Sequence, residues 1–255
     1  MAKRKAALLF LAVAATAHAE WTMLSTDSEP GRAGIVHRHV VLENSQTNER
    51  AMIDLVLFST TSCTLRLIDQ PTPPRSDLAY AMRQERCLAG VNGGYFDPDY
   101  MPIGLLVVDG NVVAPLQRAR LLTGVLTASS RGVQILRIRE FSRHPKLDAA
   151  VQSGPFLVDL ARRVGGLDDS RSARRTFAAM GNNDRVALGF CAEVSLAQLA
   201  QILTTTQLAG DFRIQRALNL DGGSSSAFWF ARENGAAYSI PEQKAVRDFV
   251  AIVAR

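Results

Sequence analysis

The sequence has little cysteine and little histidine, and these shortages limit the chemistry that its 255 residues can support. Its three cysteines are an odd number, so they cannot all pair, and sequence alone does not fix the pairing. Cys63 and Cys87 could form a bridge if the strands beside them are neighbours, whereas Cys191 lies in an apolar run typical of a buried thiol. No histidine accompanies any of the three, which argues against a nucleophilic cysteine.

The sequence also lacks an apolar run long enough to cross a bilayer. Its first apolar stretch, residues 6–16, is shorter than the roughly 20 residues that a spanning helix needs. Lys3-Arg4-Lys5 precedes it, and Ala17-His18-Ala19 follows as an A-x-A cleavage site. We therefore expect residues 1–19 to be a signal peptide, rather than an uncleaved anchor. The protein is then periplasmic or secreted, with no membrane span after cleavage.

The net charge of the chain is small once the expected signal peptide is removed. The whole chain has a formal net charge of +5, and three of those charges belong to Lys3, Arg4 and Lys5. The remaining +2 is too small to indicate a nucleic-acid partner, and we expect none. Residues 20–255 show no internal repeat, linker or low-complexity tract, and their length fits one domain.

What the sequence does contain is a polar turn between two apolar runs, ALNLDGGSSSAFWF at residues 217–230. Asn219 and Asp221 are two residues apart, so on a strand their side chains share a face. Gly222 and Gly223 can adopt positive φ angles or let a ligand approach the main chain. The alternative is an ordinary hairpin turn of the Asp-Gly type, which this composition also fits.

A second stretch, LAGVNGGYFDP at residues 88–98, has the same organisation. A short apolar run ends at Asn92, Gly93 and Gly94 follow, and Asp97 comes after two aromatic residues. Polar groups at the ends of strands are a common way to build a site on a rigid sheet. We therefore predict that the two turns form two walls of one cleft.

Together the two stretches resemble the phosphodiester glycosidase family. The similarity includes residues 102–110, 152–158 and 195–203 and the pair Arg175-Thr176, so it extends over roughly residues 63–255. One position departs from the family pattern, because Ser224 stands where that pattern has a third glycine. A positive φ angle at this position would strain a serine by about 1–3 kcal/mol.

The resemblance implies a hydrolase that releases a sugar from a sugar-1-phosphodiester of an envelope or extracellular glycan. Asp221 would be a general base or electrostatic stabiliser, and Arg175 would bind the phosphate, since a guanidinium contacts two phosphate oxygens at once. Asp97 is a candidate second carboxylate or metal ligand. No cofactor is required by the sequence, although a divalent cation is compatible with it. The expected substrate-binding residues are Asn92, Gly93, Gly94, Asn219, Gly222, Gly223 and Ser224.

Two other functions deserve comparison with this one. A serine hydrolase using Ser224–Ser226 is disfavoured, because the sequence has no G-x-S-x-G elbow. A non-catalytic protein of the cell envelope that binds polysaccharide in the same cleft remains an alternative, and the departure at Ser224 is its main support.

For the fold, many short apolar segments and only two helical ones predict an α+β domain, with a mixed β-sheet core flanked by a few helices. One helix is expected over residues 77–86, and another follows Ser195, with Gln198 as its capping-box partner. His37 and His39 share one face of a strand, which we interpret as a solvated face rather than a metal site.

Overall fold

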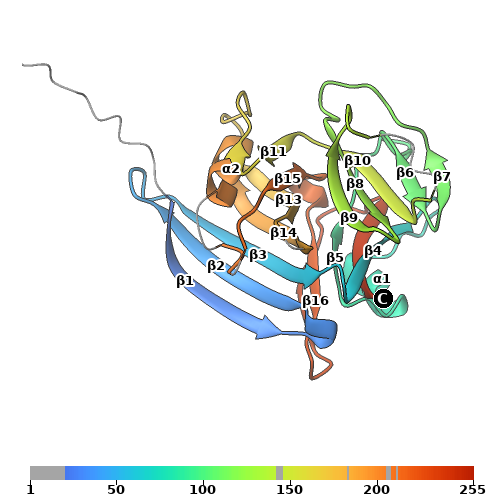
Figure 1. Cartoon of the computed structure of the whole chain (residues 1–255), viewed down its shortest axis with the longest axis horizontal. Coiled ribbons are helices and arrows are strands. Elements are labelled where there is room, and N and C mark those ends of the chain that lie inside the picture. The colour runs from blue at the N-terminus through green and yellow to red at the C-terminus, as the bar shows by residue number, and fades with distance from the viewer. Residues whose placement is uncertain (1–20, 142–145, 183, 205–207, 211) are drawn as a thin grey trace, which may run out of the picture.

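The computed structural model describes residues 21–141, 146–182, 184–204, 208–210 and 212–255. The predicted signal peptide, residues 1–19, lies outside the described residues. The described chain forms three β-sheets, with one helix against the largest sheet and another against a smaller one (Figure 1). The α+β class therefore holds only in coarse form, because strands greatly outnumber helices.

The largest sheet has eight strands, and its first three form a long curved ribbon that extends away from the rest of the molecule (Figure 1). The spatial order of the strands is β1 (Trp21–Pro30), β2 (Val36–Asn44), β3 (Arg50–Ser59), β14 (Arg185–Val194), β13 (Ala173–Met180), β15 (Arg216–Asn219), β11 (Phe156–Asp159) and β12 (Arg162–Arg163).

Two five-stranded sheets pack beside it. One has the order β7 (Asn111–Ala114), β6 (Leu106–Val108), β10 (Ala149–Ser153), β8 (Gly124–Ser129) and β9 (Gly132–Arg137). The other has the order β17 (Ala237–Ile240), β16 (Phe228–Ala231), β5 (Ala89–Asn92), β18 (Asp248–Ala254) and β4 (Cys63–Asp69).

The pairing within these sheets corrects the expected mixed sheet. All strand pairs in the described part of the chain are antiparallel. Apolar periodicity reports which face of a strand is buried, but it does not report the direction of the neighbouring strand. The sequence pattern therefore located strands without determining how they pair.

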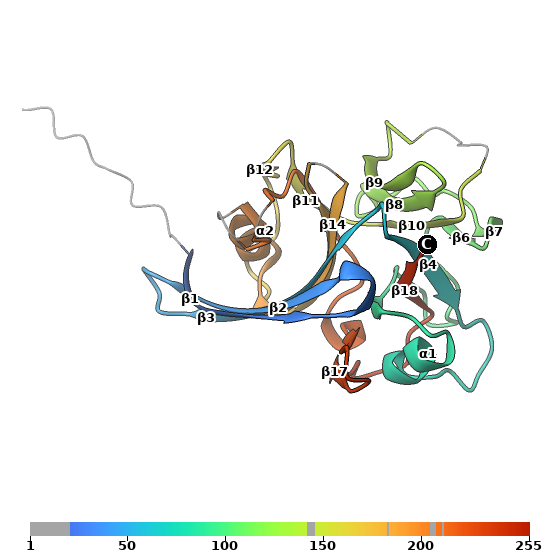
Figure 2. The same ribbon diagram turned by 60° about the horizontal axis from the view of Figure 1, so that its bottom comes forward.

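The two helices begin where their capping residues predict. In α1 (Leu78–Gln84), the Asp77 carboxylate accepts a hydrogen bond from the Tyr80 amide at 2.6 Å. Before α2 (Leu196–Thr204), the Ser195 hydroxyl and the Gln198 side chain bind each other's main-chain amides at 3.0 and 2.9 Å. Figure 2 shows α2 beside β11 and β14, and α1 near β18 on the other side. No helix among the described residues has the length and apolar character needed to span a membrane.

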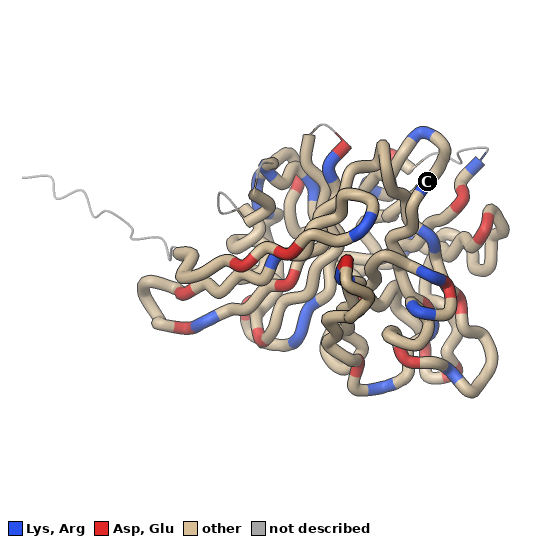
Figure 3. Tube along the Cα trace, turned by 90° about the horizontal axis from the view of Figure 1, so that it is seen from below, with Lys and Arg blue, Asp and Glu red and all other residues tan. Residues whose placement is uncertain are grey.

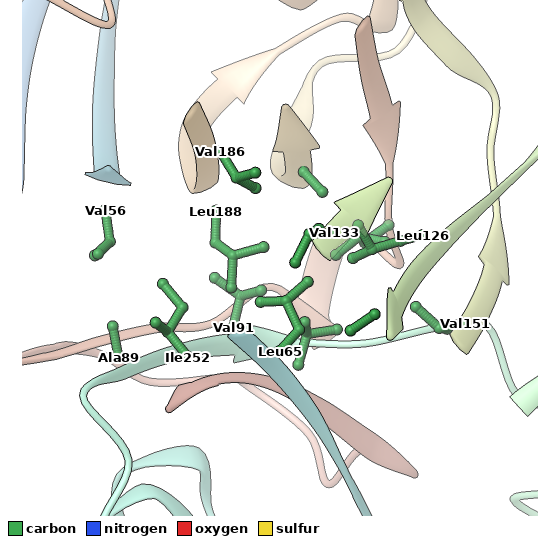
Figure 4. Close-up of a cluster of buried hydrophobic side chains, with 14 of the residues drawn as sticks. Val56, Leu65, Ala89, Val91, Leu126, Val133, Val151, Val186, Leu188 and Ile252 are labelled. Atoms are coloured by element: carbon green, nitrogen blue, oxygen red, sulfur yellow. The ribbon is translucent and has the colours of Figure 1, made fainter. Parts of the chain in front are cut away.

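The main apolar core lies where the three sheets meet (Figure 4). It joins residues of the largest sheet, such as Leu188, to Val91 of β5 and Leu126 of β8, all at most 1% exposed. Since polar side chains at the neighbouring strand ends rest on this packed junction, their positions are set by three sheets rather than by one loop.

The structure answers the question of cysteine pairing, which the sequence left open, and confirms the buried thiol of Cys191. Cys63, Cys87 and Cys191 are all free and buried. A bridge between Cys63 and Cys87 is not formed because β18 lies between β4 and β5, so the two strands are not neighbours.

The face that carries His37 and His39 is also less solvated than predicted. His37 is only 5% exposed and lies among aromatic rings, 4.8 Å from the Tyr238 ring centroid. Its Nε2 atom is 2.8 Å from Asp54 Oδ1, and His39 Nδ1 is 3.0 Å from the same oxygen. No local sequence pattern could predict this network, because Asp54 lies on another strand and Tyr238 is far from both histidines in the sequence.

Candidate functional site

The two glycine-rich motifs meet at the junction of the sheets. Asn92 ends β5, and its side-chain amide donates to the main-chain oxygen of Asp221 at 2.8 Å. The Asp221 amide in turn donates to the Gly93 carbonyl at 3.0 Å. Arg175 from β13 and Asp248 from the start of β18 lie next to these turns. We use the name candidate site for Asp221 and the residues around it that come from the two turns, β13 and β18.

Asn92 holds the two motifs together. It is 1% exposed, and its Oδ1 atom accepts hydrogen bonds from the Thr176 hydroxyl at 2.7 Å and from the Ala227 amide at 3.1 Å. Both ends of its side chain are therefore engaged by the protein. We expected Asn92 to bind substrate, whereas in the structure its side chain fixes the main chain around Asp221.

Gly93 and Gly94 contact Asp248, a residue that lies outside both glycine-rich motifs. The Gly93 amide donates to the Asp248 carbonyl at 2.9 Å, and the Gly94 amide donates to its carboxyl oxygen Oδ1 at 3.0 Å. A Cβ atom on Gly93 would lie 1.8 Å from that oxygen. The expected role of these two amides as substrate donors is therefore not supported, since both already have internal acceptors.

Asn219 and Tyr95 form a second hydrogen-bonded support, at the end of β15. The Asn219 side-chain amide donates to the Tyr95 hydroxyl at 3.0 Å and to the Gly154 carbonyl at 3.0 Å. The Tyr95 hydroxyl donates to the same carbonyl at 2.6 Å. Asn219 is 2% exposed, so its donors, like those of Asn92, serve the protein.

In the turn after Asp221, one main-chain amide is bonded within the described part of the protein, and the next two are not. The Gly222 amide donates to Asp221 Oδ1 at 2.9 Å. The next two amides, those of Gly223 and Ser224, have no acceptor among the described residues. Of the glycines expected to donate to substrate, only Gly223 keeps its amide available, and Ser224 adds a second.

The departure at Ser224 does not strain the main chain. Gly223 has a φ angle of +64°, whereas Ser224 is not among the residues with positive φ. The residue that requires glycine is therefore Gly223, one position earlier than the residue that departs from the family pattern.

Arg175 is held beside the turn with part of its guanidinium group available. Its Nε donates to the Val194 carbonyl at 3.0 Å, and its Nη2 donates to the Arg171 carbonyl at 2.6 Å. Its Nη1 has no such acceptor among the described residues and faces Gly222, where a Cβ atom would lie 3.9 Å away. The side chain is 9% exposed, so its position is fixed before any anion binds.

Burial sets the protonation of the site. Burial raises the pKa of Asp221, while the nearby Ser225 hydroxyl, the hydrogen bond from the Gly222 amide and the charge of Lys244 lower it in part. Burial, together with the Asp221 charge, also raises the pKa of Tyr95. A carboxylate with a raised pKa is a better proton acceptor than an exposed one, which suits it to acid–base chemistry.

Asp248 has a larger shift in pKa than Asp221. Burial raises its pKa to about 7, with Asp69 and Asp221 adding to the rise and the Gly94 amide and Arg247 opposing it. The site therefore contains an acidic group close to half-protonated near neutral pH. The sequence did not point to Asp248 or Lys244, because both lie outside the two glycine motifs and neither belongs to a motif of its own.

Asp97 is not brought to Asp221 by any contact in the described structure. Its Oδ1 atom accepts the amides of Asp99 and Met101 at 2.9 and 2.8 Å, so it shapes its own loop. No group of three or more potential metal-binding side chains is found among the described residues. The proposed metal-ligand role of Asp97 gains no support from its surroundings.

Comparisons with known proteins agree with the motifs. The chain matches a family model described as phosphodiester glycosidase over residues 85–253. No curated protein matches it. Its structure is similar to the zebrafish N-acetylglucosamine-1-phosphodiester α-N-acetylglucosaminidase catalytic domain auto-inhibited by its pro-peptide, with a TM-score of 0.63, 15% identity, and coverage of 91% of this chain and 88% of that one. A hypothetical protein from Synechocystis gives a TM-score of 0.60 at 16% identity, over 87% of this chain and 62% of that one. At such identities the similar structures show the fold alone.

Proposed function

The chain belongs to the phosphodiester glycosidase family, and from this premise we propose that it is a secreted hydrolase that releases a sugar from a sugar-1-phosphodiester of an envelope or extracellular glycan. The observation that carries the proposal is the position of Asp221. Its carboxylate lies half-buried in the turn that also contains the unpaired amides of Gly223 and Ser224, and the next residue, Gly222, faces Nη1 of Arg175.

This arrangement suits cleavage at an anomeric carbon. The C1–O bond breaks, and the oxygen leaves with its electron pair on the phosphate group. C1 gains positive character as it does so, and a nearby carboxylate such as Asp221 stabilises that charge. A water molecule then adds its oxygen to C1, and Asp221 accepts the proton that the water loses.

The leaving group is already an anion, so binding its charge matters more than protonating it. Arg175 Nη1 and the amides of Gly223 and Ser224 are donors of the kind that stabilise a phosphate group as its charge grows. Lys244, whose charge acts on Asp221, is a further cation beside the turn. The supporting hydrogen bonds of Asn92 and Asp248 hold this donor set in place without contacting the substrate.

The alternative of a polysaccharide-binding protein without activity drew its support from Ser224. Ser224 has no positive φ angle and no acceptor for its amide among the described residues, so the departure does not by itself argue against the hydrolase. Binding without turnover nevertheless makes a distinct experimental prediction, so one assay separates the two functions.

The test is release of free sugar from a methyl phosphodiester of N-acetylglucosamine-1-phosphate. We expect Asp221→Asn, which is nearly isosteric, to reduce kcat by a factor on the order of 10² or more. Asp97→Asn is the matched control, because Asp97 is also a turn carboxylate of the glycine motifs but contacts only its own loop. Equal activity of the two variants would contradict the assignment of Asp221, and binding of the ester without release by the unchanged protein would contradict the hydrolase.

A further inference from the structure

A second set of positive charges lines a cavity outside the candidate site. An open cavity of about 820 Å³ is bounded by the loop of residues 118–123 and by the end of β9 with the two residues after it. We call it the arginine groove, because Arg118, Arg120, Arg137 and Arg139 line it. No residue of the candidate site lines the groove, so its charge is additional to that of Arg175.

Most of this charge is not neutralised by the protein. Arg137 Nε donates to Asp159 Oδ2 at 2.7 Å, and its guanidinium group lies over the Phe156 ring. Arg118, Arg120 and Arg139 are exposed and form no ion pair among the described residues.

The two carboxylates near the groove are already occupied. Arg216 binds Glu140 at 2.6 Å and also lies 3.3 Å from Asp159, which Arg137 contacts. The charge of Arg139 also acts on Glu140. Arg118 and Arg120 have no carboxylate partner among the described residues, so the groove keeps an excess of positive charge. In the view of Figure 3, basic and acidic residues are otherwise interspersed along the chain. Such a concentration of like charge favours binding of an anion with several charges.

The groove is connected to the candidate site through one short segment. The Phe156 amide donates to the hydroxyl of Thr123, a lining residue of the groove, at 2.7 Å. Gly154, two residues earlier, packs so closely on this loop that a Cβ atom would lie 2.1 Å from the Leu121 carbonyl. The carbonyl of Gly154 accepts the hydrogen bonds of Tyr95 and Asn219. One wall of the groove thus continues into the support of Asp221.

We propose that the arginine groove binds a polyanionic chain of phosphodiester-linked units that continues from the phosphate of the substrate. The proposal rests on the proposed function, because it extends the substrate beyond the phosphodiester at Asp221. The cavity volume lies within the range of about 300–1,000 Å³ that is usual for ligand sites. One guanidinium group can bind two phosphate oxygens at once, so a set of arginines suits a chain with repeated phosphates.

The lining of the groove favours such a chain over a nucleic acid. Its residues are four arginines with Ala119, Leu122, Thr123 and Ile138, and none of these is aromatic. Proteins that bind single-stranded nucleic acids stack the bases on aromatic side chains in addition to binding the backbone. The groove offers charge and aliphatic surface instead.

The first experiment measures binding of a synthetic poly(glycerol phosphate) of defined length by calorimetry, with neutral dextran and a single-stranded oligonucleotide for comparison. The test variant is R118Q/R120Q/R139Q. The control is R83Q/R162Q/R163Q, which removes three exposed arginines outside the groove. We expect the test variant to bind poly(glycerol phosphate) at least about tenfold more weakly than the unchanged protein, with a smaller dependence on salt between about 50 and 200 mM. The control should stay within about twofold of the unchanged protein.

Equal weakening in both variants, or unchanged binding by the test variant, would overturn the proposal. Tighter binding of the oligonucleotide than of the poly(glycerol phosphate) would also overturn it. The second experiment compares kcat/KM for sugar-1-phosphodiesters with one and with several phosphate units. The test variant should lower the ratio of long to short substrate by about tenfold, and an unchanged ratio would contradict the proposal.

The failures of the two proposals are distinguishable. If the unchanged protein cleaves neither substrate but binds poly(glycerol phosphate) in a way that needs the three arginines, the groove stands and the hydrolase fails. If it cleaves the short substrate and the three arginines do not affect the polymer, the hydrolase stands and the groove fails.

Discussion

At the scale of single residues, Arg175 shows how the protein can position a side chain before a ligand binds. Two of its nitrogens bind the carbonyls of Val194 and Arg171, which leaves Nη1 for an anion. Lysine has one nitrogen and cannot hold both carbonyls while reaching the turn at Gly222. We expect Arg175→Lys to raise KM for a sugar-1-phosphodiester by about tenfold or more, measured by initial rates.

The control for this prediction is Arg163→Lys, since Arg163 is exposed on β12 at the edge of the largest sheet. Unchanged KM in Arg175→Lys would show that charge alone is sufficient, and that the planar guanidinium group has no role in binding.

Asp248 gives a prediction about pH. Burial raises its pKa from 3.8 to about 7, so between these values the folded protein holds a proton that the unfolded chain has lost. The free energy of unfolding therefore falls as the pH rises through this window. Asparagine cannot ionise and keeps an oxygen for the Gly94 amide. We expect the free energy of unfolding of Asp248→Asn, relative to that of the unchanged protein, to rise by about 1–3 kcal/mol from about pH 5 to about pH 8.

Urea unfolding at the two pH values measures this difference. A variant whose stability follows the same pH dependence as the unchanged protein would mean that Asp248 is ionised in the folded state throughout. The comparison within one variant removes any constant effect of the substitution on packing, because that effect is the same at both pH values.

The sequence predicted which residues gather at the site better than it predicted what each one does. Asn92 and Asp221 are in contact as expected, because each lies at the end of a strand or just after one and the motifs resemble one family. The amides of Gly93 and Gly94 were assigned to substrate because nothing nearby in sequence occupies them. Their partner is Asp248, 154 positions from Gly94. Local patterns identify polar groups, but only the tertiary structure shows which of them are already bonded.

At the scale of the element, α2 was predicted from local signals alone. Ser195 and Gln198 satisfy each other's amides, and the Ser195 hydroxyl also donates to Asp169 Oδ1 at 2.6 Å. We expect Ser195→Ala to lower the free energy of unfolding by about 0.5–2 kcal/mol, measured by urea denaturation. In a double-mutant cycle with Gln198→Ala, the two effects should be less than additive, and additivity would show that the capping box is not formed.

Sheets were harder to predict than helices for a physical reason. A helix bonds to itself, so its ends can be read from residues three or four positions apart. A strand takes its hydrogen bonds from another segment, and β18 shows the consequence. It separates β4 from β5 although it follows them by more than a hundred residues, so no local pattern reports the position of Cys63 relative to Cys87.

At the scale of the whole molecule, the fold should not depend on disulfides. Burial raises the pKa of all three thiols, that of Cys87 to about 11, and each is free. We expect the Tm to be the same with and without a reducing agent. An alkylating reagent should label all three cysteines only after unfolding, as counted by mass spectrometry. A Tm that drops on reduction would contradict the free thiols of the structure.

The position of β18 also sets the order in which the protein can acquire its site. The strand inserts between β4 and β5 and begins at Asp248, the residue that fixes Gly93 and Gly94. A growing chain that has not yet released this segment has a gap in the middle of a sheet and an unsupported turn at the future site. Contacts between such distant segments form slowly, because a long loop must close first. The site therefore cannot form until β18 has been synthesised and has inserted between β4 and β5.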